Sequence, residues 1–440
     1  MLGAVSGRTR TARGCVVAFL AVCLAASACT STSGTVVEPG PTSPVPPSQH
    51  SAEPTADQPE RLAVRPHRNA PGVIAAGSAP TVIEGARTRI WWCGQGGDIL
   101  HASADGMNGR FTTLRAVLSG GCDPSVVKAD GVYRLYYTRA DGDRGTAIGL
   151  ATSKDGLHWR ASGGTPIARG ASQPAIVHLG GWFYLMFTDT SASGRQTLLR
   201  SRDPEFQQGV QKLGSLAGSG ADLMWVDVLD AFAVAQQTRG GTTLAFWNRD
   251  FTEQPYAEVT VPGPGRDGPG LVRTPAGHAP VSERDPCGTV PIDLVRATGK
   301  TSGLRHAGLD LVGVPGCADR DDALRLLDGY AFPSPEHTMD LITDGQLIRI
   351  ERRSVAVSLA PGGVLGARPT LPKLAVSARL NSGAPVLRSR DGGIGLLLDD
   401  RLWPLRTPSL AKRIARLNAA DVRVVSDITW VAYPVASTLG

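Results

Sequence analysis

The chain has 440 residues, including 53 glycines and 32 prolines, and patterns typical of long helices are rare. This length and composition predict a β-rich protein with two domains. The net charge of +6 includes arginines of the N-terminal segment. It therefore does not indicate a nucleic-acid partner, although it is compatible with weak attraction to acidic wall polymers.

The first 28 residues are typical of an export signal. Arginines at positions 8–13 precede an apolar stretch at 16–25, which is too short to span a bilayer, and small residues follow at 26–28. Cleavage there leaves Cys29 first, which resembles the bacterial lipoprotein signal, although Ala26 stands where leucine is usual. We expect Cys29 to be lipidated and to anchor the protein to the outer face of the bacterial cell membrane. Ordinary secretion is the alternative.

Residues 29–66 are rich in proline, serine and threonine and contain few large apolar side chains. Such a segment cannot bury a core, so the sequence predicts an extended tether between the anchor and the folded part.

The stretch from Cys122 to Ile167 contains four short strand patterns separated by turns rich in glycine and aspartate. Apolar and polar residues alternate most clearly at 132–138, and the fourth pattern carries Trp159. Four antiparallel strands of this length form a sheet of the size of a propeller blade. Because one such sheet leaves an apolar face bare, neighbouring sheets must cover it.

The neighbouring sheets are indicated by two repeating markers. Inner-strand patterns begin at Pro80, Pro124, Pro174 and Leu223, which are 44, 50 and 49 residues apart. A turn of the Ser-x-Asp type, with Asn-Arg-Asp in the last copy, recurs at steps of 50, 48 and 47 residues and ends at Asp105, Asp155, Asp203 and Asp250. A fifth unit begins near Leu271. We therefore predict a five-bladed β-propeller over residues 67–300.

Four cysteines remain after the signal and the lipid candidate: Cys93, Cys122, Cys287 and Cys317. An even set in an exported protein indicates disulfides, and four cysteines allow three pairings. Cys93 ends a second strand and Cys122 begins the next inner strand, so blade geometry places both at one end of the sheet and favours Cys93–Cys122 with Cys287–Cys317. No CxxC or histidine cluster supports the rival reading, a metal site, and we expect neither metal nor cofactor.

Residues 301–440 show a different repeat. The segment 339–354 aligns with 394–409 at an offset of 55 residues, and each copy has the pattern of a hairpin with an aspartate turn. We expect brief helices at 323–327 and 409–417, the second capped by Ser409. The sequence thus predicts an all-β chain in which the propeller precedes a small, mostly β C-terminal domain with an internal repeat. The alternative is that the copies are further blades.

The blade at 122–167 resembles those of the five-bladed glycoside hydrolases. Its Asp123-Pro-Ser-Val-Val stretch, tyrosine-rich strand and segment Ile148–Trp159 are similar to family 43, the β-xylosidases and α-L-arabinofuranosidases. The likeness extends over about residues 78–299. It implies an inverting mechanism with a base, an acid and a third carboxylate that tunes the acid, all at the starts of inner strands.

The resemblance carries over to only one of the three catalytic positions. Asp123 matches the tuning carboxylate of the second blade. The place of the base in the first blade holds Ala79-Pro80, and the place of the acid in the third holds Ser172-Gln173-Pro174. Either other residues have taken over these roles, or the propeller binds sugar without cleaving it.

Three carboxylates are candidates for catalysis: Asp123, Asp222, which opens the fourth inner strand, and Glu283 in the fifth unit. The alternatives are a structural role between blades for Asp123 and a plain turn for Glu283. For sugar binding the candidates are Trp225, whose ring can stack on a sugar, and His278 near the axis. Ordinary packing is the alternative for both residues.

Two functional classes remain. The retained Asp123 blade favours the first, an exported glycoside hydrolase acting on arabinose- or xylose-containing polysaccharide, toward which we lean slightly. The missing base and acid favour the second, a non-catalytic glycan-binding lipoprotein with a degenerate glycosidase site, so catalysis itself stays open. In both, we expect a polysaccharide or wall glycan as partner, membrane contact through the lipid anchor, no nucleic acid and a monomer.

Overall fold

The computed structural model of the chain describes residues 60–67 and 78–440, apart from positions 86, 95, 144, 168, 192–193, 299–302 and 318. The expected export signal, Cys29 and most of the expected tether lie outside these residues. None of the described helices is long and apolar enough to cross a membrane.

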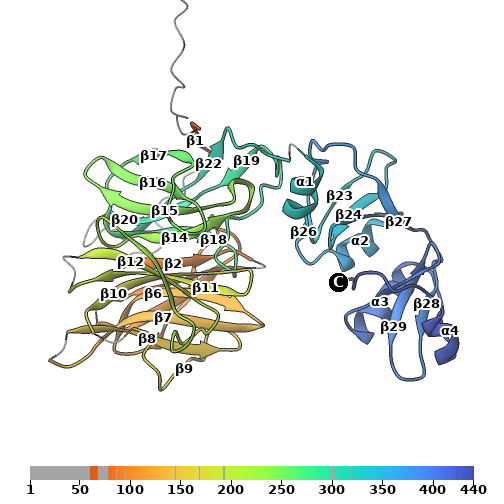
Figure 1. The fold of residues 1–440 in the computed structure, drawn as a ribbon, viewed down its shortest axis with the longest axis horizontal. Coiled ribbons are helices and arrows are strands. Elements are labelled where there is room, and N and C mark those ends of the chain that lie inside the picture. Colours follow the sequence, from red (N-terminus) through yellow and green to blue (C-terminus); the bar gives the residue numbers. More distant parts are fainter. Residues whose placement is uncertain are drawn as a thin grey trace, which may run out of the picture. The chain divides into compact units, whose positions relative to one another are not determined.

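Five small antiparallel sheets form the predicted propeller (Figure 1). The first four have four strands each and the fifth has three. Blade by blade, the strands are β2 (Ser78–Ile83), β3 (Thr88–Cys93), β4 (Ile99–Ala104) and β5 (Thr112–Leu118); β6 (Gly121–Ala129), β7 (Val132–Ala140), β8 (Thr146–Ser153) and β9 (Arg160–Ala161); β10 (Ala171–Leu179), β11 (Trp182–Asp189), β12 (Arg195–Ser201) and β13 (Gln211–Leu216); β14 (Asp222–Val226), β15 (Ala231–Thr238), β16 (Gly241–Trp247) and β17 (Tyr256–Pro262); β18 (Arg266–Arg273), β20 (Leu294–Ala297) and β21 (Leu304–Ala307).

The inner strands close into a ring. Each of β2, β6, β10, β14 and β18 contacts the next, and β18 also contacts β2. That last contact is a short parallel pairing, Val272 opposite Val82 and Arg273 opposite Ile83, which joins the fifth blade to the first. The expected inner strands therefore all exist, and the five-bladed prediction is confirmed.

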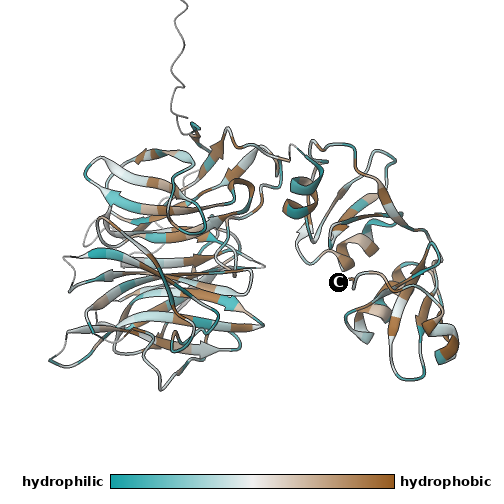
Figure 2. Cartoon of the chain, viewed as in Figure 1, coloured by the Kyte–Doolittle hydropathy of each residue, from teal (hydrophilic) through white to brown (hydrophobic). Residues whose placement is uncertain are grey.

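Alternation along the strands builds the core between blades. Successive side chains of a strand point to opposite faces. Thus Val126 packs into the cluster between the first and second blades, whereas Val127 packs into the cluster between the second and third. In the same way, Trp91 packs between the first and second blades, whereas Trp92 packs between the fifth and the first. Each of the five interfaces between blades holds one such cluster, and apolar residues along the strands are visible in Figure 2.

Two disulfides form with the predicted pairing. Cys93 at the end of β3 joins Cys122 in β6, with Cα atoms 4.9 Å apart. Cys287 joins Cys317, with Cα atoms 5.0 Å apart. Bridges of this kind persist in oxidising compartments, which agrees with an exported protein.

Strand pairing crosses two of the domain boundaries that the sequence predicted, those at residues 66 and 300. β1 (Ala63–Pro66), which falls in the expected tether, pairs with β22 (Leu309–Val312), and β19 (Thr289–Pro291) completes this small sheet. β21 and β22 both lie beyond residue 300. β21 completes the fifth blade, and β22 is the central strand of the small sheet. Leu62 is buried beside β22 in the cluster between blades four and five. One short apolar pattern within a proline-rich stretch was too weak to reveal this pairing.

The C-terminal region repeats one topology twice. In each copy three antiparallel strands are followed by a helix and a strand that returns parallel to the first. The first copy has β23 (Tyr330–Pro333), β24 (Met339–Thr343), β25 (Gln346–Ile350), α2 (Arg353–Leu359) and β26 (Gly363–Val364), with β27 (Val376–Leu380) added beside β25; the second has β28 (Val386–Arg388), β29 (Ile394–Leu398), β30 (Arg401–Pro404), α3 (Pro408–Leu417) and β31 (Val422–Val424). The parallel strands and helices distinguish these units from blades, so the copies are not additional blades.

Turn chemistry explains the hairpins of both copies. Asp344 and Gly345 have φ values of 48° and 68°, and Asp399 and Asp400 have values of 47° and 60°. Two consecutive positive φ angles give the turn that matches the twist of a hairpin, and aspartate and glycine tolerate them.

Three further helices complete the described chain: η1 (Asp227–Leu229), α1 (Arg320–Leu326) and α4 (Asp427–Val431). The expected cap of α3 was displaced by two residues. Thr407, not Ser409, accepts the capping bond from the Leu410 amide, because Pro408 occupies the first helical position, where its fixed φ is favourable.

Candidate functional site

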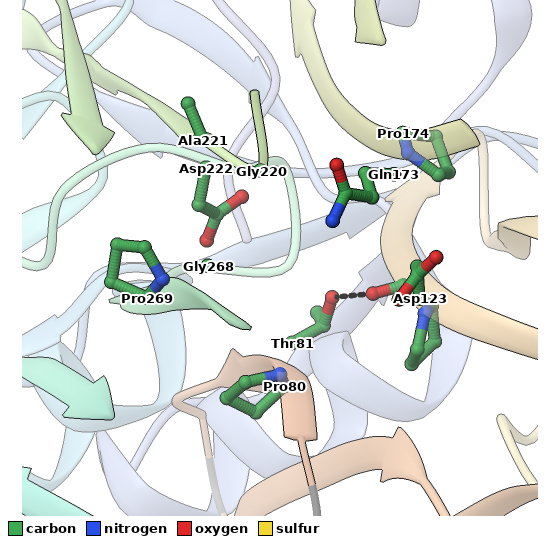
Figure 3. Close-up of a pocket in the computed structure, with 11 residues that line it drawn as sticks. Pro80, Thr81, Asp123, Gln173, Pro174, Gly220, Ala221, Asp222, Gly268 and Pro269 are labelled. Carbon is green, nitrogen blue, oxygen red and sulfur yellow. Dashed lines mark hydrogen bonds between the residues drawn. The ribbon is translucent and has the colours of Figure 1, made fainter. Parts of the chain in front are cut away.

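A pocket lies where the inner strands begin, at the mouth of the central channel, which we call the funnel (Figure 3). Strand bulges precede Ser125 in β6 and Ala175 in β10. Within them Asp123 and Gln173 adopt left-handed conformations, with φ values of 48° and 53°. A bulge adds one residue to the strand and re-aims a side chain, and both residues line the pocket. The pocket has a volume of about 30 Å³, which is room for little more than a water molecule.

Asp222 also lines the funnel, and its carboxylate accepts three hydrogen bonds from the protein. One oxygen accepts from the Leu223 amide at 2.9 Å and from the Arg273 guanidinium at 3.2 Å, and the other accepts from the Leu271 amide at 2.8 Å. Burial raises the pKa of Asp222, while the positive charge of Arg273 and the two amides act against that increase. The carboxylate therefore holds the fourth and fifth blades together.

Arg273 is the residue that joins these contacts across the ring. Its side chain is fully buried. Besides Asp222 it donates to the Leu223 carbonyl at 2.7 Å and to the Ser125 hydroxyl at 2.9 Å. That hydroxyl also accepts from the Ile176 amide at 3.0 Å. One guanidinium thus connects inner strands of the second, fourth and fifth blades directly, and the third through Ser125.

The third blade offers a neutral amide at the funnel. Gln173 accepts from the Thr188 hydroxyl at 2.9 Å, and Thr188 in turn accepts from the Gly220 amide at 3.3 Å. Among the described residues that line the pocket, Asp123 and Asp222 are the only carboxylates. Inversion requires a protonated acid and an ionised base with room for water between them. Because Asp222 is held by Arg273, the described lining of the funnel does not present such a pair.

Glu283 lies elsewhere than in the funnel. It is exposed in the loop between β18 and β19 and does not line the pocket that contains Asp123. Its charge acts on Glu84, the residue that follows β2 at the opposite end of the inner strands. The pKa of Glu84 is raised by burial, then by the charges of Asp293 and Glu283. The structure does not bring Glu283 to Asp123.

Trp225 does not offer its ring to a ligand, which departs from the sequence expectation. The residue is 1% exposed and packs between the third and fourth blades. Its indole N–H donates to Asp227 at 3.0 Å, and the guanidinium of Arg249 covers its ring. The position of Trp225 in its strand did not reveal whether its ring packs inside the protein or stacks on a sugar.

His278 is held at the end of the channel opposite to the funnel. Its Nδ1 lies 3.0 Å from an Asp227 oxygen, and its Nε2 lies 2.9 Å from the His178 carbonyl oxygen. Both partners are acceptors, so the ring is best satisfied with both nitrogens protonated. Burial lowers the pKa of His278, but the hydrogen bond and charge of Asp227 outweigh it, and the pKa is raised overall.

The segment 273–279, which we call the strap, closes this end of the channel. Its carbonyls at 273, 275, 276 and 277 accept, in that order, from amides of the first, second, third and fourth inner strands, namely Glu84, Lys128, His178 and Trp225. Gly277 has a φ of 91°, and a Cβ there would lie 3.1 Å from the Val177 Cα. Only glycine fits this close approach.

Sequence reasoning missed Arg273 and the strap. One signal was present, since Arg273 ends the apolar run Gly270-Leu271-Val272 of an inner strand. A fully buried charge requires a partner, and Asp222 supplies it. Among the described residues, no group of three or more His, Cys, Asp or Glu is arranged to hold a metal ion.

Several solved structures of glycoside hydrolases are similar to this chain. A family 43 β-xylosidase/α-arabinofuranosidase from a compost microbial metagenome is 12% identical over 64% of this chain and 99% of its own, with a TM-score of 0.42. A family 117 glycoside hydrolase of the marine bacterium Zobellia galactanivorans is 12% identical over 58% and 92%, with a TM-score of 0.40. The catalytic domain of the family 62 α-L-arabinofuranosidase of Coprinopsis cinerea is 10% identical over 58% and 98%, with a TM-score of 0.38.

No family model matches the chain, and no curated protein matches it in sequence. The resemblance that the Asp123 blade indicated is thus found among solved structures, while the five-bladed fold is established by the sheet topology. At 10–12% identity these structures do not show what activity this chain has. Its function is therefore inferred from the residues of the site.

We expect Arg273→Met to lower the free energy of unfolding by about 3–5 kcal/mol, because it leaves Asp222 buried without its cation. Urea unfolding followed by tryptophan fluorescence measures this. The matched control is Arg87→Met, which breaks the pair with Asp105, whose side chains are 52% and 91% exposed, and should cost less than about 1 kcal/mol. A loss for Arg273→Met no larger than the control would show that the ring does not depend on the guanidinium.

The His278–Asp227 pair predicts a stability that depends on pH. Because the folded pKa of His278 is raised, its contribution is complete below the unfolded pKa of about 6.5 and is lost as pH rises through the higher folded value. Asp227→Asn keeps an acceptor for Trp225 but removes the charge. The stability difference between wild type and this variant should therefore shrink from about pH 6 toward pH 9.

Urea unfolding at several pH values measures this difference. Asp105→Asn, which removes a 91% exposed carboxylate paired with an arginine and not with a histidine, serves as the control and should show a constant difference. A difference for Asp227→Asn that stays constant or grows with pH would contradict the pairing.

Proposed function

We propose that the chain is an exported, glycan-directed propeller that binds arabinose- or xylose-containing polysaccharide without hydrolysing it. The inference that the protein does not hydrolyse polysaccharide rests on the Asp222–Arg273 pair. It commits the carboxylate of the fourth blade to holding the ring through three hydrogen bonds within the protein. The glycan-directed half rests on the Asp123 blade and its resemblance to family 43.

The neutral residue of the third blade supports the same conclusion. General acid catalysis needs a group that releases a proton to the leaving oxygen. Gln173 has an amide at this place, and Thr188 bonds to its oxygen. The small pocket volume also leaves no space for a sugar ring between Asp123 and Asp222. We infer that polysaccharide meets the funnel at its outer edge.

Hydrolysis is the second candidate, and one observation favours it. Asp123 is held at the funnel in a left-handed conformation. Non-glycine residues in this conformation are uncommon, and such strain is concentrated at functional sites. In a hydrolase Asp123 would act together with a second carboxylate. In the described lining of the funnel, that carboxylate is Asp222.

A direct test combines turnover with binding. We expect wild-type protein to release no reducing sugar from arabinan, xylan or arabinoxylan, yet to co-sediment with at least one of them. Asp123→Asn, which keeps the size of the side chain, should weaken this binding without any turnover to lose. Asp105→Asn, at a side chain that is 91% exposed on the first blade, is the control and should bind as wild type.

Sugar release by the wild type that falls about 10²–10⁴-fold in Asp123→Asn would contradict the binding proposal in favour of the hydrolase. Wild-type protein that neither releases sugar nor binds these polymers would contradict both.

We further propose that Cys29 carries a lipid anchor. The support is the sequence pattern of residues 8–29, and anchoring would hold the propeller at the outer face of the membrane within reach of wall polymers. Stable anchoring by acyl chains requires more than one of them. Labelling of growing cells with a fatty-acid analogue should mark the wild type, and Cys29→Ser should abolish the label. A mutant labelled as strongly as the wild type would exclude this site.

A further inference from the structure

A groove on the fourth blade, separate from the funnel, is larger than the funnel pocket. Its volume is about 390 Å³, inside the range of about 300–1,000 Å³ that is typical of small-molecule sites. The wall on one side is the end of β13 with Ser215 to Ala217, and the other side is the face of β15, β16 and β17.

The register of the fourth blade orders the residues along this groove. Gln236 lies opposite Thr243, Val234 opposite Ala245, and Phe232 opposite Trp247. Since every second residue shares a face, these pairs follow one another along the groove. The small pair Val234 and Ala245 forms the floor, with amide and hydroxyl groups toward one end and the indole of Trp247 toward the other. From Thr243 to Trp247 the strand rises by about 13 Å, which is longer than one sugar ring.

Polar groups of the groove are available to a ligand. Among the residues that the structure describes, no hydrogen-bond partner is present for the side chains of Thr243, Gln254 and Glu258 or for the indole N–H of Trp247. Gln236, in contrast, donates to the Ala217 carbonyl at 3.3 Å, which fixes its position at the wall. The groove therefore combines a held amide with several donors and acceptors that have no partner among the described residues.

Trp247 is suited to act as a platform. The ring is partly buried and stacks with Phe251 at a centroid distance of 6.3 Å and an interplanar angle of 28°. It also packs against the cluster between the third and fourth blades. Such support fixes the orientation of the ring before a ligand arrives, which lowers the entropy cost of binding.

We propose that this groove binds a neutral oligosaccharide. A sugar presents apolar C–H faces and a circumference of hydroxyl groups that both donate and accept. Trp247 offers a flat apolar surface, while Gln254, Glu258 and Thr243 offer the matching planar and hydroxyl groups. Glu258 is the one charged residue of the lining, and it is an acid, so the groove disfavours uronic-acid polymers. This inference rests on the proposed glycan-directed function and adds a second contact with the polysaccharide, apart from the one at the edge of the funnel.

Isothermal titration with xylo-oligosaccharides and arabino-oligosaccharides tests the groove, with oligogalacturonate as the acidic comparison. Trp247→Ala should weaken the affinity of the full-length protein at least about tenfold. Because truncation of a packed indole can disturb folding, Gln254→Ala and Thr243→Val are measured as well, and both should weaken binding. Trp182→Ala is the matched control, since Trp182 is a partly buried tryptophan of the third blade outside the groove. It should bind as wild type.

The outcomes separate this inference from the proposed function. Unchanged affinity of all three groove variants, with binding lost in Asp123→Asn, would overturn the groove and leave the funnel as the site. Wild-type protein that binds no saccharide would overturn both. Tighter binding of oligogalacturonate than of the neutral oligosaccharides, or binding of a peptide in their place, would overturn the assignment of ligand class.

Discussion

The buried guanidinium of Arg273 is the interaction on which the centre of the propeller depends. An arginine is permanently charged, and removing it from water carries a cost of several kcal/mol unless charge and hydrogen bonds compensate. Here the compensation comes from Asp222, the Leu223 carbonyl and the Ser125 hydroxyl. Each partner belongs to a blade other than that of Arg273. The guanidinium therefore meets these partners only when the blades stand in the right order, and the strap that begins at Arg273 repeats this requirement through backbone bonds.

This structural use of Asp222 constrains the chemistry of the funnel. A catalytic carboxylate must change its protonation state or activate water, and both need a group whose hydrogen bonds are open to the substrate. Both oxygens of Asp222 already accept hydrogen bonds within the protein, from two amides and from Arg273. Gln173 cannot release a proton. A propeller of this kind retains the geometry that presents side chains at inner-strand starts, while Asp222 holds the ring and Gln173 is a neutral amide.

The blades were largely predictable from sequence, and the site only in part. Turn residues and inner-strand starts recur at a fixed period, so the sequence alone predicts the ring and the Cys93–Cys122 contact at neighbouring strand ends. Asp123 and Asp222 were assigned to the funnel because both stand where inner strands begin. The partners of Asp222 were not predictable, since Arg273 comes from the next blade, and hydrophobic periodicity does not say which buried charges meet. The two-residue strand β26 was likewise too short to leave a pattern.

The groove beside Trp247 follows from the geometry of blades around an axis. Inner strands touch one another, whereas outer strands diverge, so the space between neighbouring blades widens outward and must be filled by larger side chains. Between the third and fourth blades, Leu213 and Leu216 fill part of that space together with Trp247. Further along β15 and β16 from Trp247, the same face carries Ala245, Thr243 and Gln236 instead, which are small or polar. A surface that is left open and polar beside a fixed indole does not improve packing. Its residues are best explained by a ligand that offers both an apolar face and polar groups.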